Sequence, residues 1–312
     1  MYATSMEKEQ AVAWNEAPTS LPTELIEYYE ETGMDYGAWS EGFNMHFGFW
    51  KWGLNPFRRE GMLEQMSREI LQRVRPAGQP EAKGTPIRLG DFGCGLGATT
   101  RTALAEYADI EIDALTVVDW QVDFAKRLTN HQRAHFHTAD YCATPFKDER
   151  FDGVYMVESI CHAEGLHKKN AIHEVMRNLK PGGRFVVADG FLKQGRPKQR
   201  WLAWCIEQVA HNWAVDTFAD QNAFLEALAE AGFTDIRCEE ISWQIAPSVL
   251  HTPVVLIRFL LKQLFFGKRK MTRARWGHLR ACALAPIVGL ARRHFGYMII
   301  IATKPFEGGT TD

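Results

Sequence analysis

The stretch IRLGDFGCGLGATT, residues 87–100, decides the fold. A short β-rich run leads into a turn that carries Gly93, Gly95 and Gly97, and a helical run follows. Glycines at alternate positions let the backbone approach a bound ligand without obstruction by Cβ atoms. Asp91 precedes the first glycine by two residues, and the spacing G-x-G-x-G differs from the G-x-G-x-x-G of dinucleotide-binding turns. A carboxylate at this point disfavours a phosphate and favours a cationic amino-acid ligand.

Short strand-like runs alternate with helical runs after this turn, which predicts a parallel α/β sheet. The strand-like runs are ALTVVD, RAHFHTAD, FDGVYMVE, RFVVADG, FTDIRCEEISW and YMIIIATKP. A helical insertion with two apolar runs separates the last two of them, and helices rich in aromatic residues are predicted before the glycine turn. Residues 1–20 are expected to form a frayed N-terminal arm, and residues 73–86 are expected to form a loop.

Acidic residues stand at the ends of the next strand-like runs. Asp119 lies at the distance where an acid accepts both hydroxyls of a ribose, with a helix N-cap as the alternative. Asp140 can accept the amino group of an adenine while Tyr141 packs on the ring. Trp120 and Gln121 follow Asp119 directly and are expected to line the same site.

Four segments, DFGCGLG, VVDW, TADYCATPFKDERFD and LKPGGRFVVADGF, together resemble the successive motifs of class I S-adenosylmethionine-dependent methyltransferases, over about residues 85–192. The resemblance implies a Rossmann-like, mostly parallel seven-stranded sheet with a reversed last strand. It also implies S-adenosylmethionine as the cofactor, held at the carboxyl edge of the sheet. Asp91 and the three glycines would then face the methionyl part, Asp119 the ribose and Asp140 the adenine.

Four segments are expected along the chain. Residues 1–80 form an aromatic N-terminal helical cap, and residues 81–244 form the cofactor-binding core. Residues 245–295 form a basic and apolar helical insertion that covers the acceptor site, and residues 296–312 form the last strand and a tail.

Two segments outside the glycine turn resemble, more loosely, the sterol, tocopherol and prenyl-diphosphate C-methyltransferases. They are FDGVYMVESICHAEG, with Glu158 and His162, and DYGAWSEGFNMHFGFW, with Tyr36, Trp39 and His46. This resemblance implies a lipophilic acceptor, methylated at a carbon of an isoprenoid. The resulting carbocation is stabilised by aromatic faces and then loses a proton to a base. Glu158 is the predicted base and His162 the second choice, with Tyr36 and His46 in the same site. A structural acid at a strand end and a core histidine are the alternatives.

Other functions stay open at this point. An O- or N-methyltransferase of a phenolic or amine natural product would use the same acid and imidazole without needing aromatic stabilisation. A nicotinamide-dependent oxidoreductase is disfavoured by the glycine spacing. A non-catalytic cofactor-binding or membrane-surface protein is the remaining class.

The charge of the chain is unevenly distributed. The formal net charge of the 312 residues is −2, yet residues 241–304 contain eleven Lys or Arg and no Asp or Glu. This basic stretch, with Arg269, Lys270, Arg273 and Arg275, suits a phosphate-bearing ligand, an anionic membrane or a solvated helical face. An Asp-rich magnesium motif is absent from the sequence, so Mg²⁺ is expected only if the acceptor is a diphosphate.

Partners and location follow from the same composition. The six cysteines form no C-x-x-C pair and are expected to be reduced thiols, and the sequence predicts no metal site and no nucleic-acid partner. The N-terminus lacks the apolar run of a signal peptide. A cytoplasmic protein is expected, with peripheral membrane contact and the oligomeric state left open.

Overall fold

The structure, a computed structural model, describes residues 22–75, 85–267 and 269–306. The arm expected over residues 1–20 and most of the loop expected over residues 73–86 lie outside the described residues. The helices and strands of the described chain follow in this order: α2 (Thr23–Thr32), η1 (Gly33–Ala38), α3 (Arg59–Val74), β1 (Ile87–Phe92), α4 (Ala98–Glu106), β2 (Ile110–Thr116), α5 (Asp119–Thr129), β3 (Ala134–Thr138), β4 (Phe151–Val157), η2 (Ile160–His162), α6 (Lys169–Asn178), β5 (Leu179–Leu192), α7 (Arg200–Asn212), α8 (Gln221–Glu230), β6 (Thr234–Glu240), α9 (Ser242–Val249), α10 (Thr252–Phe266), α11 (Arg273–Leu290) and β7 (Phe295–Thr303).

The strands form one seven-stranded sheet in the order β3-β2-β1-β4-β5-β7-β6. Strands β1 to β5 pair in parallel, whereas β7 runs antiparallel to both β5 and β6. This arrangement confirms the predicted Rossmann-like fold with a reversed last strand. The carboxyl ends of β1, β2, β3 and β4 therefore meet at one edge of the sheet, where the predicted site residues follow them.

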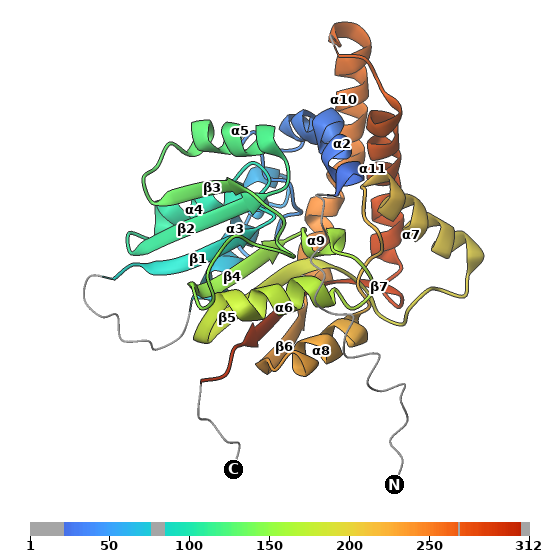
Figure 1. Cartoon of the computed structure of the whole chain (residues 1–312). Coiled ribbons are helices and arrows are strands. Elements are labelled where there is room, and N and C mark those ends of the chain that lie inside the picture. The colour runs from blue at the N-terminus through green and yellow to red at the C-terminus, as the bar shows by residue number, and fades with distance from the viewer. Residues whose placement is uncertain (1–21, 76–84, 268, 307–312) are drawn as a thin grey trace.

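Apolar runs place the sheet between two layers of helices (Figure 1). The run FDGVYMV of β4 is buried almost along its length, as expected for a parallel strand that is covered on both faces. Side chains of α6 and α8 pack on one face of the sheet, and side chains of α3, α4, α5 and α9 pack on the other. This core fixes the strands whose ends carry the site.

A helical layer lies beyond the carboxyl edge of the sheet. Helix α11 packs against α7, α10, α2 and α9, so elements from the two ends of the chain lie side by side there (Figure 1). Helices α9 to α11 separate β6 from β7, where the sequence predicts an insertion. Helix α7, which was not among the elements predicted from the sequence, forms a further small core with α11. The division of the chain into the four segments given above stays a proposal.

One helical stretch among the described residues, Ser242–Phe266, is long and apolar enough to cross a membrane by length and composition alone. The most apolar 18 residues of this stretch have a mean hydropathy of 1.5, and 6% of them are buried in the protein. The stretch is interrupted between α9 and α10, at Leu250 and His251. Core helices and signal sequences satisfy the same criteria, so the stretch by itself assigns no membrane span.

Candidate active site

The glycine turn after β1 has a backbone that only glycine adopts readily. The φ angles of Gly93, Gly95 and Gly97 are 83°, 51° and 73°. A Cβ atom on Gly93 would lie 2.3 Å from the Cβ of Ser159, and one on Gly95 would lie 2.7 Å from the sulfur of Met45. Gly93 and Gly95 line a cavity of about 480 Å³, here called the cofactor cavity. Gly97 does not line it and instead occupies the left-handed N-cap position of α4.

Asp91 lies in the wall of this cavity near the end of β1. Its carboxylate is 3% exposed and accepts a hydrogen bond of 2.6 Å from the Thr100 hydroxyl. Burial raises its pKa to about 6. Within the described chain no Lys or Arg forms an ion pair with Asp91. A buried acid beside a glycine cradle fits a ligand that brings its own cation, such as the ammonium of a methionyl group.

The structure places only one of the three residues predicted after β2 in the cavity. Gln121 is buried, lines the cavity and accepts a hydrogen bond of 2.8 Å from the Thr116 hydroxyl, while its amide nitrogen has no partner. Asp119 is exposed as the first residue of α5. Trp120 packs beneath the N-terminal helices, where a Cβ on Gly33 would lie 2.5 Å from its ring. Asp119 and Trp120 therefore do not line the cavity, and their contacts with the cofactor stay predictions.

The helix-cap alternative for Asp119 is also not what the structure shows. The N-cap of α5 is Val118, and no side chain caps this helix end. Asp119 stands in the first turn, where a negative charge is favourable beside the positive end of the helix dipole.

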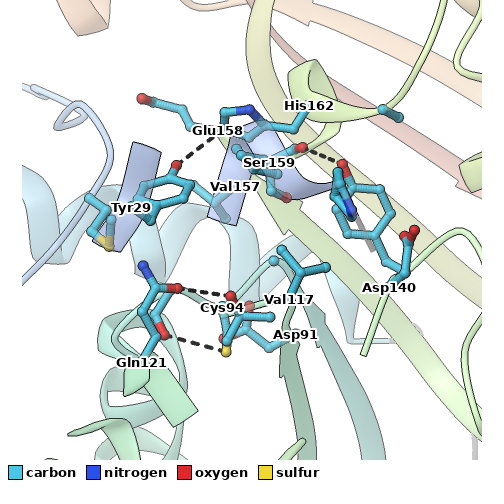
Figure 2. A pocket seen from close by; sticks show the side chains of 18 of the residues that line it. Tyr29, Asp91, Cys94, Val117, Gln121, Asp140, Val157, Glu158, Ser159 and His162 are labelled. Carbon is cyan, nitrogen blue, oxygen red and sulfur yellow. Dashed lines mark hydrogen bonds between the residues drawn. The ribbon is translucent and has the colours of Figure 1, made fainter. Parts of the chain in front are cut away.

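Asp140 and Tyr141 line the cofactor cavity just after β3, as predicted. The carboxylate of Asp140 accepts a hydrogen bond of 2.7 Å from the backbone N–H of Cys142. The hydroxyl of Tyr141 donates to the backbone carbonyl of Ser159 at 2.8 Å, so this buried ring ties the turn after β3 to the turn after β4. Figure 2 shows Asp140 facing the cavity opposite Gln121.

Glu158 stands where three cavities meet. It lines the cofactor cavity and two apolar cavities of about 100 and 340 Å³. Its Oε1 atom accepts a 2.6 Å hydrogen bond from the backbone N–H of Phe47 and a 2.8 Å hydrogen bond from the hydroxyl of Tyr297. Burial, and next to it the charge of Asp189, raise the pKa of Glu158 to about 8 despite these donors. Its Oε2 atom accepts no hydrogen bond from the described residues, which leaves it available to a ligand.

His46 and His162 flank Glu158 as neutral imidazoles, because burial lowers both pKa values to about 4. The Nδ1 atoms donate to the carbonyl oxygens of Phe47 at 2.9 Å and Ala214 at 3.1 Å, so each Nε2 carries a lone pair. The Nε2 of His162 accepts from the hydroxyl of Tyr29 at 3.1 Å (Figure 2), whereas the Nε2 of His46 is buried without a partner. Of the two imidazoles, only that of His46 thus has a ring nitrogen without a hydrogen-bond partner, although its lowered pKa makes it a weaker proton acceptor than Glu158.

Aromatic side chains surround Glu158 on the apolar side. Tyr36 lines both apolar cavities but not the cofactor cavity. The walls of the smaller apolar cavity include the rings of Tyr36, Trp39, Phe47, Trp213 and Phe259. The larger one extends between α7, α9, α11 and β7.

Several cavity residues have no signal in the sequence pattern. Tyr29 and Met45 come from the N-terminal segment, Trp213 follows α7, and Tyr297 belongs to the last strand. Tyr297 bonds to Glu158 across 139 sequence positions, so spacing alone does not connect the two. Ser159 is the exception, because its position directly after Glu158 could have pointed to it.

The four cations named in the sequence analysis, Arg269, Lys270, Arg273 and Arg275, do not line the three cavities. The guanidinium of Arg275 is 3% exposed and binds both carboxylate oxygens of Asp35, at 2.7 and 3.0 Å. Arg269 lies 3.2 Å from the same carboxylate. Arg269 and Arg275, two of the four cations considered for a phosphate, thus hold the insertion to the N-terminal helices. Lys270 is exposed. Among the described residues no group of three or more His, Cys, Asp or Glu could hold a metal ion.

Comparisons with known proteins match the same region. Residues 90–187 match the protein family described as "Methyltransferase domain". An O-methyltransferase of Penicillium expansum is 32% identical over 251 residues, covering 79% of this chain and 84% of the relative. An O-methyltransferase of Pyrenophora dematioidea is 30% identical over 213 residues, covering 65% of this chain and 73% of the relative.

Among solved structures, a geranyl diphosphate C-methyltransferase from Streptomyces coelicolor A3(2) is similar with a TM-score of 0.65. The sequence identity is 16%, and the match covers 93% of this chain and 100% of that one. A likeness at this identity shows the fold alone.

Proposed function

The chain belongs to the class I S-adenosylmethionine-dependent methyltransferases, and we propose that it methylates a lipophilic small molecule bound in the apolar cavities beside Glu158. The observation that carries this proposal is the position of Glu158. Its carboxylate lines the cofactor cavity and both apolar cavities, so a group that reacts at their junction lies beside a base.

S-adenosylmethionine supplies an electrophilic methyl group on a sulfonium. Asp91, Gly93 and Gly95 would hold its amino-acid end, because no described Lys or Arg forms an ion pair with the buried carboxylate and the two glycines line the cavity without a Cβ atom. Asp140 and Gln121 would hold the nucleoside from opposite walls of the cavity. The unpartnered amide nitrogen of Gln121 fits a polar ligand that accepts a hydrogen bond.

The geometry favours an acceptor carbon in an isoprenoid-like alkene. The π electrons of the alkene would form the new carbon–methyl bond as the sulfur–methyl bond breaks, which would release S-adenosylhomocysteine and leave a cation on the neighbouring carbon. Aromatic rings attract such a cation when water is excluded, and the smaller apolar cavity is lined by them. Loss of a proton to Oε2 of Glu158 then restores the double bond. The ionised form of Glu158 is required for this step, with His46 as a second acceptor.

A hydroxyl acceptor is the second candidate. The two fungal relatives reported above are named O-methyltransferases. In that case Glu158 or His46 would take the proton of a phenol, and the oxygen would form the new bond. An amine would be handled in the same way.

A neutral acceptor fits better than a prenyl diphosphate. The walls of the three cavities include Arg292 as their one arginine and contain no lysine among the described residues. Arg292 pairs with Glu240 at 2.5 Å. A buried diphosphate would therefore lack the cations that its charge requires. Mg²⁺ would be needed only if such an acceptor were bound.

Product analysis tests this proposal. The full chain is incubated with methyl-labelled S-adenosylmethionine and, separately, a sterol, a long-chain prenylated phenol and geranyl diphosphate. The expected result is label in one of the first two products, with mass spectrometry showing whether carbon or oxygen carries it. Transfer to the diphosphate alone would contradict a neutral lipophilic acceptor.

A further inference from the structure

An apolar stripe lies exposed along α10. Val254, Ile257, Leu261 and Leu264 on α10 follow Leu250, which lies just before the helix, at intervals of four and three residues, and the four on α10 share one face of the helix. Their exposed fractions range from 48% to 76%. Helix α10 projects from the body of the protein (Figure 1). A helix normally buries a face with this spacing, so this face lacks its partner.

Cations border this α10 stripe. Arg258 and Lys262 are exposed and each follows a residue of the stripe directly. The surrounding segment, residues 241–304, has eleven Lys or Arg and no acidic residue. Phe265 and Phe266 at the end of the helix are 70% and 78% exposed. Apolar and aromatic side chains bordered by cations are typical of helices that lie in the headgroup region of an anionic bilayer.

From the apolar stripe and its cationic border we infer that α10 docks this protein on an anionic lipid bilayer. A second copy of the chain fits less well. A symmetric contact through α10 would bring Arg258 and Lys262 of both copies together, and residues 241–304 offer no carboxylate to separate them.

The helix lies on the bilayer and does not cross it. The preceding helix α9 is fixed in the core, where Ile245 and Ser248 are 3% and 0% exposed. The Ser248 hydroxyl also accepts a 2.8 Å hydrogen bond from the backbone N–H of Gly48. Of the long apolar stretch, only the α10 half projects from the body of the protein, so the stretch does not span the bilayer.

The docking face continues into the larger apolar cavity. Trp243, Leu250 and Leu290 line that cavity and are also 75%, 70% and 81% exposed. A lipophilic acceptor would pass from the bilayer toward Glu158 without crossing water. This last step rests on the proposed function, whereas the docking itself does not.

Vesicle sedimentation tests the docking without cofactor or acceptor. The full chain is mixed with sucrose-loaded vesicles of phosphatidylcholine, with or without phosphatidylglycerol. Binding is expected to the anionic vesicles and to weaken in high salt. The double variant Ile257→Asp/Leu261→Asp should lower the partition coefficient by about tenfold or more. The variant Arg258→Gln/Lys262→Gln should lower it by about fivefold per cation.

Leu128→Asp is the matched control, because Leu128 is 41% exposed on α5, away from the stripe. Its partition coefficient should equal that of the wild type. Calorimetry with S-adenosylmethionine verifies that each variant is folded.

The docking is overturned by an absence of binding to anionic vesicles, or by equal losses in the stripe variants and the control. It is also overturned if ultracentrifugation shows a dimer that the stripe variants dissociate. A chain that binds vesicles but transfers no methyl group leaves the docking in place and refutes the proposed function.

Discussion

Replacing Glu158 by Gln keeps the shape of the side chain and removes its charge, so the variant separates two effects that the structure assigns to this residue. If Glu158 is the proposed base at the junction of the cavities, its ionised carboxylate is worth about 10² to 10⁴ in turnover. Glu158→Gln should lose that factor while binding S-adenosylmethionine almost as tightly as the wild type. Turnover of the wild type should rise with pH up to an inflection at or below about 8, since a bound cation lowers the pKa.

The same buried charge should destabilise the cofactor-free protein. Burial raises the pKa of Glu158 from 4.5 to about 8, so the folded state keeps a proton that the unfolded chain releases above pH 4.5. Stability therefore falls as the pH rises from 4.5 to 8, and at 1.36 kcal/mol per pKa unit the loss reaches roughly 5 kcal/mol. Glu158→Gln has no proton to lose, so it should gain stability relative to the wild type as the pH rises through this window.

Urea unfolding without cofactor, repeated at pH values from about 5 to 9, measures this difference. Glu226→Gln is the matched control, because it removes a carboxylate that is exposed on α8. The control should follow the wild type in both stability and turnover. Parallel stability curves for Glu158→Gln and the wild type would refute the burial argument, and full activity of Glu158→Gln would refute its role as the base.

Three further variants test the rest of the site. Gly95→Val should abolish binding of S-adenosylmethionine, because the φ of Gly95 is 51° and a Cβ there would lie 2.7 Å from the sulfur of Met45. Calorimetry that finds unchanged affinity in a folded variant would refute the role of this glycine. Gln121→Ala should weaken cofactor binding by roughly 1 to 3 kcal/mol, and Asp119→Ala should weaken it by less than about 0.5 kcal/mol. A larger loss of affinity in Asp119→Ala than in Gln121→Ala would restore Asp119 as the ribose acid. Tyr297→Phe removes a donor to the ionised Glu158, so the pH at half-maximal turnover should move upward, and a downward shift would contradict that hydrogen bond.

The sequence predicted the fold because each strand and turn of the core carries its own local signal. The G-x-G-x-G turn, the apolar runs and the acids at strand ends each depend on residues close together in the chain. Asp91, Asp140 and Glu158 lie at the cavities for this reason, since the carboxyl ends of parallel strands share one edge. The helical insertion before the last strand was also visible, because its apolar and basic composition is local.

Side-chain direction was harder to predict. Asp119 and Gln121 are two residues apart at the start of α5, and the exact first residue of the helix decides which of them faces the cavity. The structure begins the helix at Asp119, so Gln121 points inward. The walls contributed by Tyr29 and Tyr297 were not predictable from spacing, because they depend on packing between elements far apart in sequence.

The position of Glu158 depends on contacts with four separate parts of the chain. Its backbone N–H donates to the Ala188 carbonyl of β5 at 2.8 Å, and its carboxylate is held by Phe47 and by Tyr297. The next residue, Ser159, donates to the Phe92 carbonyl at 2.7 Å, directly before the glycine turn.

Glu158 itself has a φ of 47°, a conformation that costs a non-glycine residue roughly 1 to 2 kcal/mol. This strain is maintained because Ser159 packs so closely under Gly93 that a Cβ there would lie 2.3 Å away. The glycine at that position makes room for the turn that carries Glu158, the proposed base. Because one close contact joins the two turns, we expect a shift in the glycine turn to change the direction of the Glu158 carboxylate.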